Sequence, residues 1–328
     1  MGGSTYVISL PKNWIDDLEL KTGTYVSLVK NPNDSITLFQ EEINKKIHAV
    51  TIVSKSDSNE SIRRKIVAIY LSGYSIIEIK TKGMEIPSIH RGTIRDLVRT
   101  TLMGTEIIEA SSERIVLQVL TQLAQLSFNV ALKRMYITAI NMHRDAIHAL
   151  KEFDIDYADE VVKMDDEVDR FSLYMMRNLN LALENTQILL DSGLRKPSEC
   201  LEYRTIIKCV ERIADHAALV AKKIKYLKSP IDKQILRDIE IVSNESLSVF
   251  EKSMDALSKR DYSMAEKVAS SVSMVIAREK KQMNALKQDG NVAIIKLILE
   301  DIRRTAEYSS DIAEVVMDGT INTVVEEQ

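Results

Sequence analysis

The spacing of apolar residues changes character near position 121. From there onward apolar side chains recur every three to four residues, which is the period of an amphipathic helix. Breaks rich in glycine, proline and aspartate divide this region. The pattern predicts six helices, near residues 122–152, 157–190, 197–228, 231–258, 262–287 and 290–318. Long helices joined by short loops pack as antiparallel neighbours, so we predict a helical bundle over 121–328.

The bundle region repeats itself. Residues 149–161 match residues 256–268 position by position, and Glu211–His216 matches Arg303–Tyr308. Two copies of a three-helix unit, at 121–229 and 230–320, account for both matches.

The first 120 residues follow shorter periods. Strand-like segments at 5–10, 25–29 and 35–39, with a short helix opened by Pro11, predict a small β module over 1–43. Strands at 48–53, 74–80, 106–109 and 115–119 alternate with helices at 59–71 and 87–102. This βαβαββ order predicts a small α/β layer over 46–120. The predicted fold class is therefore mainly α, with a β module and an intervening α/β layer.

Composition limits the classes of protein to which this chain can belong. The chain has 328 residues, a net charge of −4, 5% aromatic residues and two cysteines. The charge balance gives no overall basic surface for nucleic acid, although a local patch is compatible with it. Neither a CxxC pair nor an apolar run of about 18 residues occurs. We therefore expect a cytoplasmic protein without a membrane span.

Two predicted helices each carry a pair of acids four positions apart. Asp165 and Asp169 form one pair, and Glu211 and Asp215 form the other. Residues at this spacing share one face of a helix, where like charges repel by a few tenths of a kcal/mol. A solvated helix face explains either pair alone, but packing of the two helices would create a cation site. His216 is rotated by about 100° from Asp215, which indicates a supporting group and not a ligand.

The second repeat lacks this pattern. Val272 and Ile276 stand at the positions of the first acid pair, while Arg303 and Glu307 stand at those of the second. We therefore predict one metal site per chain, with ion pairs Arg303–Glu307 and Glu300–Arg304 in the second repeat. No Glu-x-x-His or Gly-x-Ser-x-Gly motif occurs, so we do not expect an enzyme.

A basic stripe runs along the second helix of the α/β layer. Arg91, Arg95 and Arg99 are four apart. Either they form a solvated helix face, or they bind an anion together with the basic run 63–65. No glycine-rich phosphate loop is present.

The first 40 residues resemble the SpoVT/AbrB swapped-hairpin family. The segment Gly-Gly-Ser-Thr-Tyr-Val-Ile-Ser-Leu-Pro-Lys-Asn-Trp at 2–14 and the turn Lys-Thr-Gly-Thr-Tyr-Val at 21–26 carry the resemblance. It implies an intertwined homodimer, and many members of the family bind DNA. Because Lys12, Lys21 and Lys30 are the only cations before residue 31, the resemblance favours dimerisation over DNA binding.

The bundle resembles the PhoU family. The pattern Asp-x-x-Val-Asp ending at Asp169, and Glu-Arg-x-x-Asp-His at 211–216, inside a twofold three-helix repeat, carry this resemblance. It implies a regulator of phosphate transport and phosphate homeostasis that acts with a phosphate ABC transporter or its sensor protein. It also implies a metal ion (Mg, Mn, Fe or Zn, divalent or trivalent) held by Asp165, Asp169, Glu211 and Asp215. The alternative is an AbrB-type DNA-binding transcription regulator whose bundle is a sensor domain.

Overall fold

The computed structural model describes residues 7–30, 35–40, 48–120, 127–287 and 290–325. By its contacts the chain divides into two compact units, Met1–Lys46 and Ile47–Gln328, and each is described by itself. The second unit holds two hydrophobic cores, one in the α/β layer and one in the helical bundle. The predicted domain boundary at 43 lies among residues that the structure does not describe, and the boundary at 120 lies directly before such residues.

The first unit is a hairpin with one short helix. Pro11 precedes helix α1 (Lys12–Asp17), and strand β1 (Val26–Lys30) pairs antiparallel with β2 (Ile36–Gln40). The strand predicted at 5–10 is wrong for residues 7–10, which are neither helix nor strand, while 5 and 6 lie outside the description. Alternating side chains make a strand only when a neighbouring strand takes up its backbone hydrogen bonds, and none of the described strands pairs with this segment.

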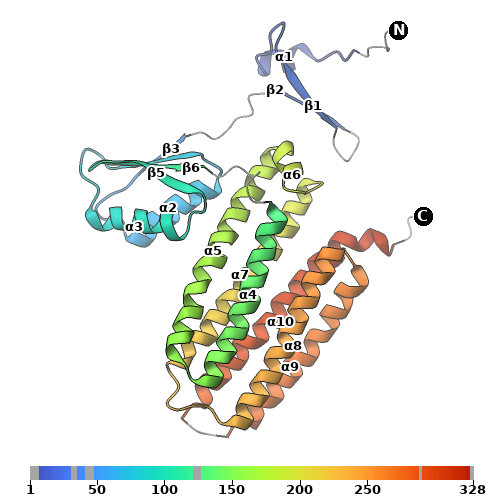
Figure 1. Cartoon of the computed structure of the whole chain (residues 1–328). Coiled ribbons are helices and arrows are strands. Elements are labelled where there is room, and N and C mark those ends of the chain that lie inside the picture. Colours follow the sequence, from blue (N-terminus) through green and yellow to red (C-terminus); the bar gives the residue numbers. More distant parts are fainter. Residues whose placement is uncertain (1–6, 31–34, 41–47, 121–126, 288–289, 326–328) are drawn as a thin grey trace. The chain divides into compact units, whose positions relative to one another are not determined.

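The α/β layer has the predicted βαβαββ order. Its elements are β3 (His48–Ile52), α2 (Asn59–Leu71), β4 (Ile76–Lys80), α3 (Ser88–Thr100), β5 (Thr105–Ala110) and β6 (Arg114–Val119). The sheet order is β3-β4-β6-β5, with β3 and β4 parallel and the other pairs antiparallel. Helices α2 and α3 cover one face of the sheet (Figure 1). Their Ile66 and Ile94 are buried with Ile77 and Leu117 of the sheet.

Within the described residues, six long helices form the bundle, which Figure 1 shows. They are α4 (Phe128–Glu152), α5 (Ile155–Glu184), α7 (Pro197–Ile224), α8 (Lys233–Lys259), α9 (Tyr262–Ala285) and α10 (Val292–Thr320). Helices α4, α5 and α7 pack on one another, as do α8, α9 and α10, and the two sets join mainly through α7 and α10. The predicted six-helix bundle of two three-helix repeats is confirmed.

Matching loops show the repeat at the level of the backbone. Phe153 ends α4 in the left-handed conformation, and Asp154 then caps α5 by accepting a hydrogen bond from the Tyr157 amide. Arg260 and Asp261 do the same between α8 and α9. Left-handed residues with a side chain are uncommon, so their recurrence at equivalent positions reflects a shared loop design.

The single helix predicted at 157–190 is wrong at one point. Asn185 is extended (φ −144°, ψ 110°) and separates α5 from a short helix, α6 (Thr186–Asp191). Its side-chain oxygen accepts hydrogen bonds from the amides of Gln187 and Ile188. Asparagine is a favoured N-cap, so a new helix start competes here with continuation of α5.

A polar clamp docks the α/β layer on α5. The buried Arg177 donates to the carbonyl oxygens of Tyr70 and Gly73, and its guanidinium lies 4.9 Å from the centre of the Tyr70 ring. Asn180 donates to the carbonyl of Leu71 at 2.8 Å. Since the last carbonyls of a helix lack partners within it, these donors complete the end of α2.

Candidate metal centre

The two predicted acid pairs face one seam of the bundle. Asp165 and Asp169 lie on α5, Glu211 and Asp215 lie on α7, and these two helices pack side by side. All four side chains are half-buried. A fully solvated helix face therefore does not describe them.

Electrostatics shows that the four acids act on one another. Burial raises the pKa of Asp165 to about 6, and the charge of Asp215 adds to this effect. Burial raises the pKa of Asp169 to about 7, with further contributions from Glu211, Asp165 and Asp215. Burial and then Glu211 raise the pKa of Asp215. The sequence-predicted residues are therefore brought together as a mutually repelling set.

Few partners relieve this repulsion. Ser172 donates to Glu211 at 3.1 Å, and Lys208 forms an ion pair with the same carboxylate. Asp165 Oδ1 is buried and has no hydrogen-bond partner among the described residues. An unsatisfied buried acceptor costs about 1–3 kcal/mol, and more when it is charged. A cation at the seam would remove that cost.

The donor atoms suit a hard metal ion, but they are not gathered around one point. Carboxylate oxygens with a nearby hydroxyl are the ligands that Mg²⁺ and Mn²⁺ prefer. Within the part of the chain that the structure describes, no three His, Cys, Asp or Glu side chains are placed to hold a metal ion together. The metal site at Asp165, Asp169, Glu211 and Asp215 stays a prediction.

In the second repeat an arginine lies at the position that corresponds to Glu211 of the acidic seam. Arg303 forms an ion pair with Glu307, and it lies 3.4 Å from Glu279 and 3.8 Å from Glu300. The predicted pair Arg303–Glu307 is confirmed. The predicted pair Glu300–Arg304 is wrong, because Arg304 turns to Glu307 at 3.0 Å and leaves Glu300 to Arg303.

Sequence reasoning missed Glu279. The offset of the repeat, by which 149–161 matches 256–268, places it at the position of Ser172. Ser172 contacts Glu211 in the first repeat, and Glu279 contacts Arg303 in the second, so the same pair of positions is used with a different charge pattern. In the second repeat the Arg303 guanidinium therefore neutralises Glu279 and Glu307, whereas the first repeat has the carboxylate of Glu211 at the position of Arg303.

His216, the neighbour of Asp215 in sequence, makes its hydrogen bond to a different helix from the four acids. Its Nδ1 is 2.9 Å from Asp301 Oδ1 on α10, and Lys223 contacts the other oxygen of that carboxylate. The histidine therefore ties α7 to α10, and its role beside a metal site stays a prediction.

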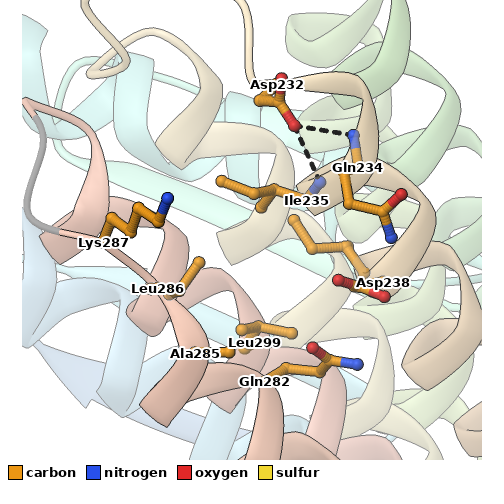
Figure 2. Close-up of a pocket in the computed structure, with 10 residues that line it drawn as sticks. Asp232, Gln234, Ile235, Asp238, Gln282, Ala285, Leu286, Lys287 and Leu299 are labelled. Carbon is orange, nitrogen blue, oxygen red and sulfur yellow. Dashed lines mark hydrogen bonds between the residues drawn. The ribbon is translucent and has the colours of Figure 1, made fainter.

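A separate cavity of about 520 Å³ opens between α8, α9 and α10. Figure 2 shows Asp232, which caps α8 through the amides of Gln234 and Ile235, at one side of this cavity, with Asp238 and Lys287 also on its wall. None of the four predicted acids lines it.

Comparison with known proteins adds family information. Residues 132–224 match the family model of the PhoU domain, and residues 1–47 match that of "Antidote-toxin recognition MazE, bacterial antitoxin". Over 130 residues the chain is 28% identical to a phosphate-specific transport system accessory protein PhoU homolog from Clostridium acetobutylicum, a match covering 38% of this chain and 55% of that protein. The chain thus spans about half the length of this curated relative.

Two solved structures are similar. The PhoU crystal structure from Streptococcus pneumoniae aligns over 61% of this chain and 96% of its own, with 18% identity and a TM-score of 0.50. The PhoU structure from Pseudomonas aeruginosa aligns over 60% and 96%, with 20% identity and a TM-score of 0.48. The first likeness shows the fold of the bundle. Both predicted resemblances are confirmed: the helical region is PhoU-like, and the N-terminal region is MazE/AbrB-like.

No helix among the residues described here combines the length and apolar character needed to cross a membrane. The two cysteines, Cys200 and Cys209, are buried and free.

Proposed function

We propose that this chain is a non-enzymatic regulator of phosphate transport. In this proposal the helical bundle docks on a cytoplasmic component of a phosphate ABC transporter or on its sensor protein. The PhoU domain match over residues 132–224 supports this, together with the PhoU-like fold of the bundle.

The docking is coupled to a metal ion at the acidic seam. The observation that carries this step is the buried, unpaired Oδ1 of Asp165 beside three further carboxylates, whose charges add to the effect of burial in raising the pKa of Asp165 and Asp169. Side-chain movements are needed to gather the oxygens, because no three of the described acids already converge. When bound, a divalent or trivalent ion (Mg, Mn, Fe or Zn) would neutralise the acids and hold α5 against α7.

Helix α5 would pass this effect to the α/β layer. The acids at 165 and 169 and the clamp residue Arg177 lie on the same helix, and Arg177 holds the end of α2. A change in the position of α5 therefore alters both the bundle surface and the docking of the layer.

The metal step is tested by elemental analysis of purified protein. Replacing Asp165 and Glu211 together with alanine should abolish bound metal, whereas Asp159→Ala, an exposed acid on α5, should retain it. Unchanged metal content in the double variant would place the site elsewhere.

The regulatory step is tested by co-purification with the phosphate transporter subunits encoded in the same genome. We expect the wild-type chain to bind them, and the double variant to bind less tightly. Absence of binding to transporter and sensor alike would refute the proposed function.

Dimerisation through the N-terminal unit completes the proposal. None of its described side chains is buried, and Trp14, Tyr25, Leu28 and Ile36 are exposed to between 55% and 84%. A module this small cannot bury enough apolar surface alone, so we propose that a second copy of the chain packs against these exposed side chains. Leu28→Lys should shift the protein from dimer to monomer in light scattering, and Ser35→Lys, which adds the same charge in the same hairpin, should not.

The second candidate is an AbrB-type transcription regulator, favoured by the antitoxin family match over residues 1–47. Few cations are available there for phosphate contacts. A mobility-shift assay at about 50 and 200 mM salt separates the two functions, because DNA binding through phosphates weakens steeply with salt. Tight, strongly salt-dependent binding would favour this candidate.

A further inference from the structure

A cavity of about 360 Å³ lies where the α/β layer meets the bundle. Its walls come from the end of α3 and from the first half of α5. Arg99 is contributed by α3, and Lys163 and Arg170 are contributed by α5. Three cations thus converge on one opening from two elements that are distant in sequence.

The cations of α5 belong to one stripe. Lys163, Arg170 and Arg177 are seven positions apart, so they lie along the same side of the helix. Arg177 is satisfied by the carbonyls at the end of α2. Arg170 is not: its Nε is buried and has no hydrogen-bond partner among the described residues.

The basic groups at the cavity also lack ionic partners. Across the described ranges, no carboxylate forms an ion pair with Arg99, Lys163 or Arg170 within 4.0 Å. Asp166 and Glu167 also line the cavity; both are exposed, and neither forms an ion pair with these cations within 4.0 Å. A buried guanidinium donor without an acceptor, at the wall of an open cavity, indicates a missing acceptor.

From this arrangement we infer that the cavity binds a small phosphorylated ligand. Guanidinium groups match the oxygens of a phosphate with paired hydrogen bonds, and Arg170 and Arg99 offer two such groups with Lys163 as a third charge. Arg99 also offsets the negative end of α3, which would otherwise repel an anion.

The remaining walls favour a phosphate ester over the free ion. Asp166 and Glu167 can accept hydrogen bonds from hydroxyl or amino groups, while Met103 and Phe171 offer an apolar surface. A sugar phosphate or a nucleoside monophosphate presents all three features: an anionic group, hydroxyls and a less polar body. The site shares no residue with the four acids of the proposed metal centre, so it goes beyond the proposed function and its failure leaves that proposal standing.

The test is calorimetric titration of the chelator-treated full chain with four probes. These are inorganic phosphate, glucose 6-phosphate, adenosine 5′-monophosphate and adenosine. Chelator treatment removes any metal that would itself bind phosphate. We expect both esters to bind and adenosine not to bind. Binding of inorganic phosphate alone, if lost in the variants below, would support the anion site and identify the free ion as its ligand.

Variants decide whether the binding is at this cavity. Arg170→Met should weaken binding at least about tenfold without lowering the thermal transition, because the donor it removes is already unpaired. Arg99→Met should also weaken binding. Arg95→Met, one turn earlier on α3 and outside the cavity, should bind like the wild type. Absence of binding by every phosphate probe, or wild-type affinity in Arg170→Met, would overturn the inference.

Discussion

Replacing Asp169 with asparagine should stabilise the metal-free protein. The carboxyl has a pKa of about 7 in the folded chain, against 3.8 for the ordinary side chain. The folded state therefore holds this proton more tightly, and the wild type loses stability as pH rises from about 4 to about 7. Asparagine keeps the shape and removes the charge.

The size of the effect follows from that difference in pKa. At about 1.4 kcal/mol for each pH unit, the full penalty is about 4 kcal/mol above pH 7. Asp169 is half-buried and not fully enclosed, so solvent screening reduces the expected gain to about 1–2 kcal/mol at about pH 8. At about pH 5, little more than a third of this gain should remain, because the folded wild type is then mostly protonated.

Urea unfolding with a chelator present measures the gain. Far-UV circular dichroism follows the helices, whereas fluorescence of Trp14, the single tryptophan, reports only the N-terminal unit. Asp159→Asn removes the same charge from an exposed position on α5 and should change little. A variant no more stable than the wild type at about pH 8, or an equal gain in the control, would show that the acids do not repel as argued.

Three further changes probe the fold. Arg177→Met should destabilise the protein by about 1–3 kcal/mol, because it removes the donor to the buried Gly73 carbonyl and one of the two donors to the Tyr70 carbonyl. Hydrogen exchange at the end of α2 should rise. Gly73→Ala should lower the free energy of unfolding in urea by about 1–3 kcal/mol, because φ is +93° and an added Cβ would lie 2.6 Å from Leu181 Cδ2. Gly83→Ala should lower it less, because φ is also positive there but nothing lies within 4 Å of the added Cβ. Burial lowers the pKa of His143 to about 4, so the wild type loses stability as pH drops from about 6.5 to 4. His143→Leu should remove this loss, which thermal melts over a series of pH values would measure.

Local patterns were sufficient for most of the elements. Helix periods, loop residues and the match of 149–161 with 256–268 depend on neighbours within a few turns, and the bundle and its repeat were predicted from them. Where two local preferences compete, the pattern failed: Asn185 fits a helix interior weakly and a helix start well, and the apolar period did not distinguish these.

Pairing between distant segments was beyond the reach of the sequence. Residues 7–10 alternate like a strand, but no described strand pairs with them. Arg303 was matched to Glu307 one turn away, while its contact with Glu279 on another helix appeared only in the structure. The cavity at Arg99 and Arg170 likewise joins positions 71 residues apart.

The sequence by itself determined that two helices each present an acid pair on one face, because the helical period sets the direction of every side chain relative to its neighbours. Only the tertiary structure decided that these faces meet at one half-buried seam, that Asp165 Oδ1 lacks a partner there, and that Arg303 of the second repeat contacts Glu279 on a neighbouring helix. The reason is physical: periodicity describes one element, whereas burial, pKa and charge pairing depend on what another element brings to it.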